Sequence, residues 1–181
     1  MIYVFLANGF EETEAICPVD LMRRAGLDVK TVAIGTERQV CSSRKIVVEA
    51  DALLSDLPDA LPEAVVLPGG MPGAENLKNS EGVRKLVCAC AQNGGVVAAI
   101  CAAPMVLGDL GLLNKKEAIC YPGFEKELRG AAVKKRAVVV DGRTVTAIGP
   151  GASFEFGLKL VELLKDKKTA DKIARDLLPI A

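Results

Sequence analysis

One cysteine stands where the local sequence can make a thiol reactive. Cys101 follows the apolar run Val96–Ile100 and precedes Ala102-Ala103-Pro104, so a predicted strand ends at the cysteine and a helix of small residues is expected from Ala102. A nucleophile elbow has this form, because a tight turn tolerates little bulk and leaves the nucleophile protruding. The start of a helix also favours a thiolate, so we expect a lowered thiol pKa and easier oxidation. The alternative is that Cys101 is a small buried hydrophobic residue.

The group that carries protons for this cysteine must be something other than histidine, because the chain contains none. Three carboxylates, Glu11, Glu12 and Glu14, follow the first apolar run and belong to the same edge of the predicted sheet as Cys101. A carboxyl group held in a dry pocket beside a thiolate has a raised pKa and can serve as both acid and base. The residues alone leave open which of the three does so, and two of them are expected to be exposed near a helix start.

The other five cysteines predict no second reactive site. Cys90 lies on the apolar stripe of a predicted helix and Cys88 flanks it, while Cys17, Cys41 and Cys120 have no activating neighbours. The absence of a CxxC pair and of histidine argues against a metal site. Without a secretory signal, the thiols are expected to be reduced.

The elements that must position these residues alternate along the chain. Predicted strands cover Ile2–Ala7, Val29–Ile34, Ile46–Val48, Ala64–Leu67 and Val96–Ile100, with a hairpin of Ala137–Val140 and Thr144–Ile148 around Asp141-Gly142. Predicted helices cover Ala15–Gly26, Val83–Cys90, a segment opened by Ser153 and running to Leu164, and a last segment from Thr169 to Leu178. Apolar strands alternating with amphipathic helices predict an α/β fold with a mostly parallel sheet between helices.

Three loops with chemical content follow strands of this sheet: Asn8–Glu14, Pro68–Gly73 and Cys101–Pro104. Ligands of such sheets bind beyond the carboxyl ends of the strands, so a functional site is expected there. Gly69-Gly70 alone indicates only a turn. It is not a dinucleotide fingerprint, because no GxGxxG joins a strand to a helix, and we expect no cofactor.

Composition limits the classes of partner. The chain has 181 residues, half of them apolar, with 23 basic and 23 acidic side chains. This length predicts about one domain, and the zero net charge removes the usual argument for nucleic acid or an anionic membrane. Met1–Ala7 is too short for a signal peptide, and no apolar run approaches the roughly 20 residues that span a bilayer. We therefore expect a cytoplasmic protein.

Five segments in order carry a family resemblance: Gly9–Glu14, Pro18–Gly26, Val66–Gly70, Ala99–Ala102 and Gly149–Glu155. With them the chain resembles the ThiJ/PfpI superfamily, and within it the branch of the parkinsonism-associated protein deglycase and the bacterial YajL proteins. The resemblance covers essentially the whole chain. It implies one class I glutamine amidotransferase-like domain over residues 1–181, a flavodoxin-like three-layer sandwich, and a homodimer.

The resemblance also implies roles for particular residues. Cys101 corresponds to the nucleophilic, oxidisable cysteine, and Glu14 to the protonated carboxylic acid that hydrogen-bonds it. The backbone N–H groups of Gly70 and Ala102 correspond to an oxyanion hole, for which glycine suits position 70 because the chain must pass close to the substrate. Gly69 would line the same site.

Two arginines and one tyrosine complete the implied site. Arg24 and Arg44 match arginines near the dimer interface and the active cysteine, with a solvated surface role as the alternative for both. Tyr121 stands where the branch often has histidine; it can donate a hydrogen bond but is a poor base at neutral pH. Ala102 stands where the protease-like branch has histidine, which disfavours peptidase activity.

Two functions use this pocket. The first is an enzyme acting on reactive carbonyls, a glutathione-independent glyoxalase or deglycase that takes methylglyoxal or glycated protein. The second is a redox sensor or oxidative-stress chaperone that works through oxidation of Cys101. A hydrolase or amidotransferase-like enzyme is a weaker third, because no conventional triad can form without histidine. The sequence does not separate the first two.

Overall fold

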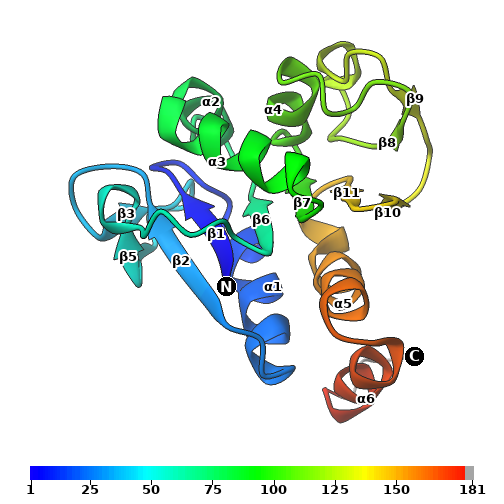
Figure 1. Ribbon diagram of the computed structural model, residues 1–181, viewed down its shortest axis with the longest axis horizontal. Coiled ribbons are helices and arrows are strands. Elements are labelled where there is room, and N and C mark those ends of the chain that lie inside the picture. The colour runs from blue at the N-terminus through cyan, green and yellow to red at the C-terminus, as the bar shows by residue number, and fades with distance from the viewer. Residues whose placement is uncertain (178–181) are drawn as a thin grey trace.

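A seven-stranded sheet forms the centre of the computed structural model, which describes residues 1–177 (Figure 1). Its strands lie in the order β10 (Val138–Asp141), β11 (Thr144–Ala147), β7 (Val96–Ile100), β6 (Ala64–Leu67), β1 (Ile2–Leu6), β2 (Val29–Ala33) and β5 (Ala52–Leu53). Every neighbouring pair is parallel except β10 with β11. The residues of β1, β6 and β7 are all buried, as their unbroken apolar runs predict.

Helices cover both faces of this sheet. They are α1 (Glu12–Arg24), α2 (Gly73–Asn79), α3 (Glu81–Gln92), α4 (Pro104–Asp109), α5 (Ser153–Leu164) and α6 (Lys167–Asp176). The β1–α1–β2 crossover steps along the sheet in one direction and the β6–α3–β7 crossover in the other. Right-handed connections therefore put α1 and α3 on opposite faces. Helix α5 packs against both α1 and α6, and α2 packs against α3 and α4, so two helical layers enclose the sheet (Figure 1). The predicted mostly parallel three-layer fold is confirmed.

The short elements differ from the prediction. The expected strand at Ile46–Val48 is β4 (Val47–Glu49), which pairs with β3 (Gln39–Cys41) in a separate two-stranded sheet. Another small pair, β8 (Glu117–Ala118) with β9 (Ala132–Val133), was not predicted, nor was α2. Elements of two or three residues are too short to show hydrophobic periodicity. Three 3-10 turns also occur, at Leu54–Asp56, Glu125–Glu127 and Pro150–Ala152.

Helix ends agree with the prediction at some places and differ at others. The helix expected from Ala102 begins at Pro104, because proline suits the first helical position. The helix predicted from Ser153 to Leu164 is confirmed as α5; its cap is Ala152, and the Ser153 hydroxyl is buried with no hydrogen-bond partner within residues 1–177. The last helix ends at Asp176, and the predicted end at Leu178 lies outside the described residues. No helix in residues 1–177 is long and apolar enough to cross a bilayer.

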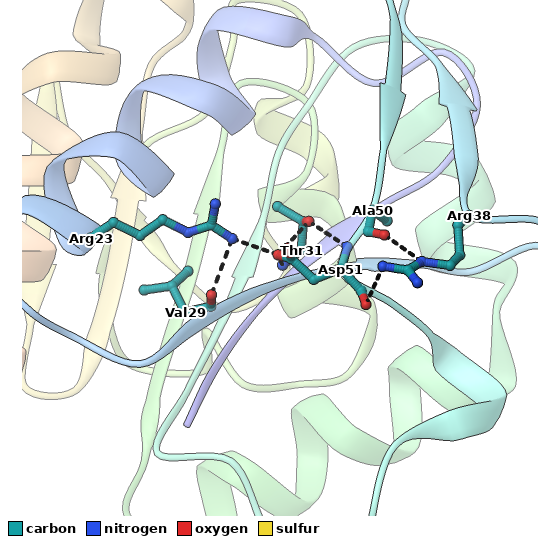
Figure 2. Close-up of polar contacts among 6 residues, drawn as sticks. All are labelled: Arg23, Val29, Thr31, Arg38, Ala50 and Asp51. Carbon is teal, nitrogen blue, oxygen red and sulfur yellow. Dashed lines mark hydrogen bonds and ion pairs between the residues drawn. The ribbon is translucent and has the colours of Figure 1, made fainter.

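A polar network fastens the β2–β5 edge (Figure 2). The Asp51 carboxylate accepts hydrogen bonds from the Thr31 N–H and hydroxyl, both at 2.8 Å, and pairs with Arg23 at the end of α1. Arg38 donates to the carbonyl oxygens of Ala50 and Asp51, each at 2.7 Å. Burial alone would raise the pKa of Asp51, but the Thr31 hydrogen bonds and the charge of Arg23 hold it below its usual value. These contacts tie β2 and the end of α1 to the segment that leads into β5.

Candidate active site

Cys101 occupies a strained turn at the carboxyl end of β7. Its φ of 64° lies in the left-handed region, which few residues other than glycine adopt. Its N–H donates to the Ala147 carbonyl at 2.9 Å, and its carbonyl accepts from the Tyr121 N–H at 2.7 Å. These bonds hold the turn, and the residue remains 8% exposed. The predicted strand–turn–helix geometry of a nucleophile elbow is confirmed, with the cysteine itself almost entirely buried.

Glu14 enters the same space from the first turn of α1. Its side chain is fully buried, and its Oε2 accepts a hydrogen bond from the Gly69 N–H at 2.8 Å. A Cβ atom added to Gly69 would lie 2.6 Å from this Oε2 and 2.7 Å from the Cβ of Cys101. Gly69 therefore leaves the room in which the carboxyl group and the thiol meet. The carboxyl group lies close enough to the Cys101 thiol for each to shift the pKa of the other, and its Oε1 has no hydrogen-bond partner in residues 1–177.

The sequence left open which of the three carboxylates lies beside Cys101, and the structure answers this. Glu11 caps α1, with a carboxylate oxygen that accepts from the Glu14 N–H at 2.7 Å. Glu12 is half-buried and accepts a long hydrogen bond of 3.4 Å from the Ser43 hydroxyl. Only Glu14 of the three reaches the cysteine. This is the residue that the family resemblance selected.

Two backbone N–H groups face the sulfur of Cys101. They belong to Gly70 and Ala102, and both favour the thiolate. Gly70 has a φ of 82°, and a Cβ there would lie 2.5 Å from the Glu11 nitrogen and 2.6 Å from the Gly9 oxygen. No side chain fits, so glycine is required for this N–H to point at the sulfur.

Burial dominates the pKa values of the pair. Burial raises the pKa of Glu14 to about 7. The hydrogen bonds with the Cys101 thiol and the Gly69 N–H lower this pKa, but by less than burial raises it. Burial, followed by the charge of Glu14 and its hydrogen bond, raises the pKa of Cys101 to about 12, although the N–H groups of Gly70 and Ala102 lower it. This corrects the expected lowered thiol pKa, because burial and a nearby carboxylate outweigh the helix start.

The two groups are best described as sharing protons. With a raised pKa of about 7 for Glu14 and about 12 for Cys101, the pair retains one proton over the neutral and mildly alkaline range. Moving that proton from sulfur to the carboxyl group removes the negative charge that raises the thiol pKa. The two N–H groups then stabilise the thiolate that results. The arrangement can therefore supply a nucleophile and an acid from one proton.

The remaining predicted residues lie farther out. The Tyr121 side chain is 47% exposed, and its ring lies beside Gly149, where an added Cβ would come within 3.2 Å of it. Arg44 is exposed in the β3–β4 turn. Arg24 pairs with Asp20 at 2.7 Å. It does not line the site of its own chain, because α1 carries it about 15 Å along the helix axis from Glu14.

Sequence reasoning did not single out three apolar side chains near the elbow. Met71, Met105 and Phe124 line one groove, and nothing in their spacing signals that they come together. A larger cavity of about 550 Å³ lies beyond β1 and β2, beside Asn8 and Asn76, and includes neither Cys101 nor Glu14. Residues 1–177 contain no group of three or more cysteine, aspartate or glutamate side chains placed to hold a metal ion.

With the fold and the arrangement of Cys101 and Glu14 described, the chain can be compared with known protein families. The sequence matches the model of the DJ-1/PfpI family over residues 1–163. The chain belongs to the DJ-1/PfpI family. The predicted resemblance to the ThiJ/PfpI superfamily is thus confirmed, and relatives bearing the DJ-1 name match it along most of its length.

Members of the DJ-1/PfpI family resemble the chain in sequence and structure. Oxidized DJ-1 of Toxoplasma gondii superposes with a TM-score of 0.95 and 36% identity, covering 99% of this chain and 98% of that one. Protein DJ-1 homolog A of Arabidopsis thaliana is 40% identical over 98% of this chain, which spans only 46% of that relative's length. The glutathione-independent glyoxalase DJR-1.2 of Caenorhabditis elegans is 31% identical over 92% of this chain and 89% of its own.

Proposed function

We propose that this protein is a glutathione-independent glyoxalase or deglycase in which Cys101 is the nucleophile and Glu14 the proton carrier. The observation that carries the proposal is the contact of both groups with the space that Gly69 leaves open. Support also comes from the family, which includes a nematode relative named as a glutathione-independent glyoxalase.

The first step is addition of the Cys101 thiolate to the aldehyde carbon of methylglyoxal. A carbon–sulfur bond forms, and the carbonyl oxygen takes the proton of Glu14 to give a hemithioacetal. The N–H groups of Gly70 and Ala102 face the sulfur and are the candidate donors to the developing oxyanion.

Glu14 then moves a proton between neighbouring carbons. Its carboxylate removes the proton of the hemithioacetal carbon and returns one to the former ketone carbon, while the hemithioacetal hydroxyl proton passes to the former ketone oxygen, which leaves a 2-hydroxy thioester. Water hydrolyses the thioester to lactate and restores the thiol. The sum is methylglyoxal plus water to lactate, so no external oxidant or reductant is needed. A carboxyl group whose pKa burial raises to about 7 suits both directions of transfer.

Turnover of methylglyoxal by wild type, Cys101→Ser and Glu14→Gln tests the proposal. We expect Cys101→Ser to be inactive and Glu14→Gln to lose about 10²- to 10⁴-fold in kcat, the usual contribution of a general acid–base. Cys41→Ser, at a half-buried cysteine outside the pocket, is the matched control and should retain activity. A Cys101→Ser variant as fast as wild type would exclude this function.

A redox-sensing or chaperone role is the second candidate. Peroxide would oxidise the Cys101 thiolate to a sulfinate, with two peroxide molecules reduced to water and the product held by Glu14 and the two N–H groups. The relative from Toxoplasma gondii has a structure described as oxidized. Intact mass spectrometry after mild peroxide treatment should show a two-oxygen adduct that Cys101→Ser lacks, and its absence in wild type would count against this role.

A homodimer is the proposed assembly. Three large apolar side chains are exposed on α1 and the β3–β4 hairpin: Ile16 at 41%, Ile46 at 53% and Val47 at 60%. Ile16 and Val48 line one shallow cavity, so α1 and this face of the hairpin lie side by side. A second copy of the chain would cover the exposed apolar side chains. Light scattering should give twice the monomer mass, and Ile16→Asp should shift it toward the monomer; a monomeric wild type would contradict the assembly.

A further inference from the structure

A cavity of about 350 Å³ opens at the amino ends of β7 and β11, away from the cysteine. Val97 and Thr144, which are partners in the pairing of these two strands, are both buried and line its inner side. Val97 precedes Cys101 by four residues, a distance of about 13 Å along a strand. The volume is within the range of small-molecule sites, so the cavity is a candidate binding site separate from that of Cys101.

The walls of this cavity are mostly apolar. They include Ala91 at the end of α3 and Leu112 in the segment after α4, and both residues are half-buried. Gly94, in the turn between α3 and β7, adds no side chain, and a Cβ atom added there would meet no atom within 4 Å. The cavity is therefore open at this turn and can admit an apolar group that packs against Leu112 and Val97.

Two cationic side chains, Lys116 and Arg143, also line the cavity, and no carboxylate of residues 1–177 does. Both lie beside the β10–β11 turn, because the Lys116 Nζ is 3.8 Å from an Asp141 carboxylate oxygen and Arg143 follows Asp141 by two residues. Glu117, next to Lys116 in the chain, is already paired with Lys134 at 2.8 Å. Lys116, Arg143 and Asp141 together leave one net positive charge, which favours a monoanion at this end of the cavity.

Arg143 has hydrogen-bond donors to spare. Its Nε donates to the Gly94 carbonyl at 3.1 Å, which fixes one side of the guanidinium group. Its Nη atoms make no hydrogen bond or ion pair within the described chain. A guanidinium group binds a carboxylate through two parallel N–H bonds. Since Arg143 is exposed and Val97 is buried, a carboxylate belongs at the mouth of the cavity and an apolar group belongs inside.

We propose that this cavity binds a monocarboxylate with an apolar body, such as a medium-chain fatty acid. The carboxylate contacts Arg143 and Lys116, and the body packs against Leu112 and Val97. A neutral ligand would bury the same apolar surface without the charge-assisted hydrogen bonds, and a cationic ligand would be repelled. The site does not depend on the carbonyl chemistry proposed for Cys101, because it lies at the other end of β7.

Titration with octanoate, followed through the backbone N–H signals of isotope-labelled protein, tests the site. The signals of Gly94, Gly95 and Leu112 should shift and saturate, while those of Gly70 and Ala102 stay in place. For a ligand of roughly ten non-hydrogen atoms we expect a Kd of about 1 mM or below. Octanol has the same chain length but no charge, and it should bind at least about tenfold more weakly. No saturation below about 10 mM, or equal affinity for octanoate and octanol, overturns the proposal.

Variants then assign the contacts. Arg143→Gln should weaken octanoate binding by about tenfold, because a hydrogen bond to a charged group is lost. Arg136→Gln is the matched control, since this arginine is exposed just before β10 and does not line the cavity, and it should bind as wild type does. Ala91→Phe should block binding by filling the cavity while both cations remain. Thermal unfolding without ligand checks that each variant folds. If a folded Arg143→Gln variant binds octanoate as tightly as wild type, Arg143 only caps the end of α3 and the proposal fails.

Discussion

Replacing Gly69 with alanine should separate the thiol from its carboxyl group. The added Cβ would lie 2.6 Å from the Glu14 Oε2, 2.7 Å from the Cys101 Cβ and 2.9 Å from the Ile100 carbonyl oxygen. To reach the 3.4 Å of ordinary contact, the carboxyl group must move by about 0.8 Å. The Ile100 oxygen belongs to the backbone of β7 and yields less readily, so the Glu14 side chain takes most of the shift.

The cost follows from how steeply catalysis depends on position. A misplacement of about 1 Å costs roughly 10²-fold in rate, and two decades correspond to about 2.7 kcal/mol of transition-state stabilisation. Forcing a methyl group into a filled site also costs about 1–3 kcal/mol of folding free energy. We therefore expect Gly69→Ala to fold with lowered stability and to lose about 10²-fold in kcat/KM for methylglyoxal.

The assay pairs turnover with urea unfolding, so that lost activity is not confused with lost fold. Gly151→Ala is the matched control, because an added Cβ there meets no atom within 4 Å. It should keep wild-type activity and stability. Wild-type kcat/KM in a folded Gly69→Ala variant would refute the view that this glycine makes room for the pair.

Three further predictions concern stability. Because burial raises the pKa of Glu14 from 4.5 to about 7, its stabilising effect is complete below pH 4.5 and is lost as the pH rises to 7. Urea unfolding should show wild type losing up to about 3 kcal/mol relative to Glu14→Gln across this window, with a constant difference above it. Asp51→Ala leaves the Thr31 N–H without its acceptor and should lower the free energy of unfolding by about 2 kcal/mol. In Gly157→Ala the added Cβ would lie 3.0 Å from the Pro18 Cα, so separating α1 from α5 should cost about 1–3 kcal/mol by the same measurement.

Matched variants at exposed positions isolate these effects. Glu37→Gln removes a surface carboxylate, Asp59→Ala a surface aspartate, and Gly35→Ala adds a Cβ with no atom within 4 Å. Each should unfold within about 0.5 kcal/mol of wild type. A Glu14→Gln difference that stays flat from pH 4.5 to 7 would contradict the buried, raised carboxyl group. If Asp51→Ala had the same free energy of unfolding as Asp59→Ala, the polar network would not contribute to stability. If Gly157→Ala had the same free energy of unfolding as Gly35→Ala, the close contact between α1 and α5 would not require glycine.

The sequence by itself predicted the layered fold and the tight turn at Cys101. Unbroken apolar runs such as Val96–Ile100 are specific to strands covered on both faces, and the small residues around Cys101 predict a tight turn. These signals are local, since each depends on the types and spacing of neighbouring residues. Short strands such as β3, β8 and β9 escaped prediction because two or three residues carry no period.

The types and spacing of residues did not say which residues meet; the family resemblance implied that Glu14 joins Cys101, and the tertiary structure gives the physical reason. Glu11, Glu12 and Glu14 have similar local sequence, and the direction of α1 alone buries Glu14 beside Cys101 while the others cap the helix or contact a loop. The tertiary structure also sets the direction in which the pKa of the Cys101 thiol shifts. Burial and the carboxylate of Glu14, 87 positions away in the chain, raise this pKa by more than the nearby helix start lowers it. Arg24 was carried away from the site by that same helix, and Met71, Met105 and Phe124 were brought together by contacts that no spacing records. A sequence sets each residue's local preference, but desolvation, charge and proximity depend on neighbours that only the folded chain supplies.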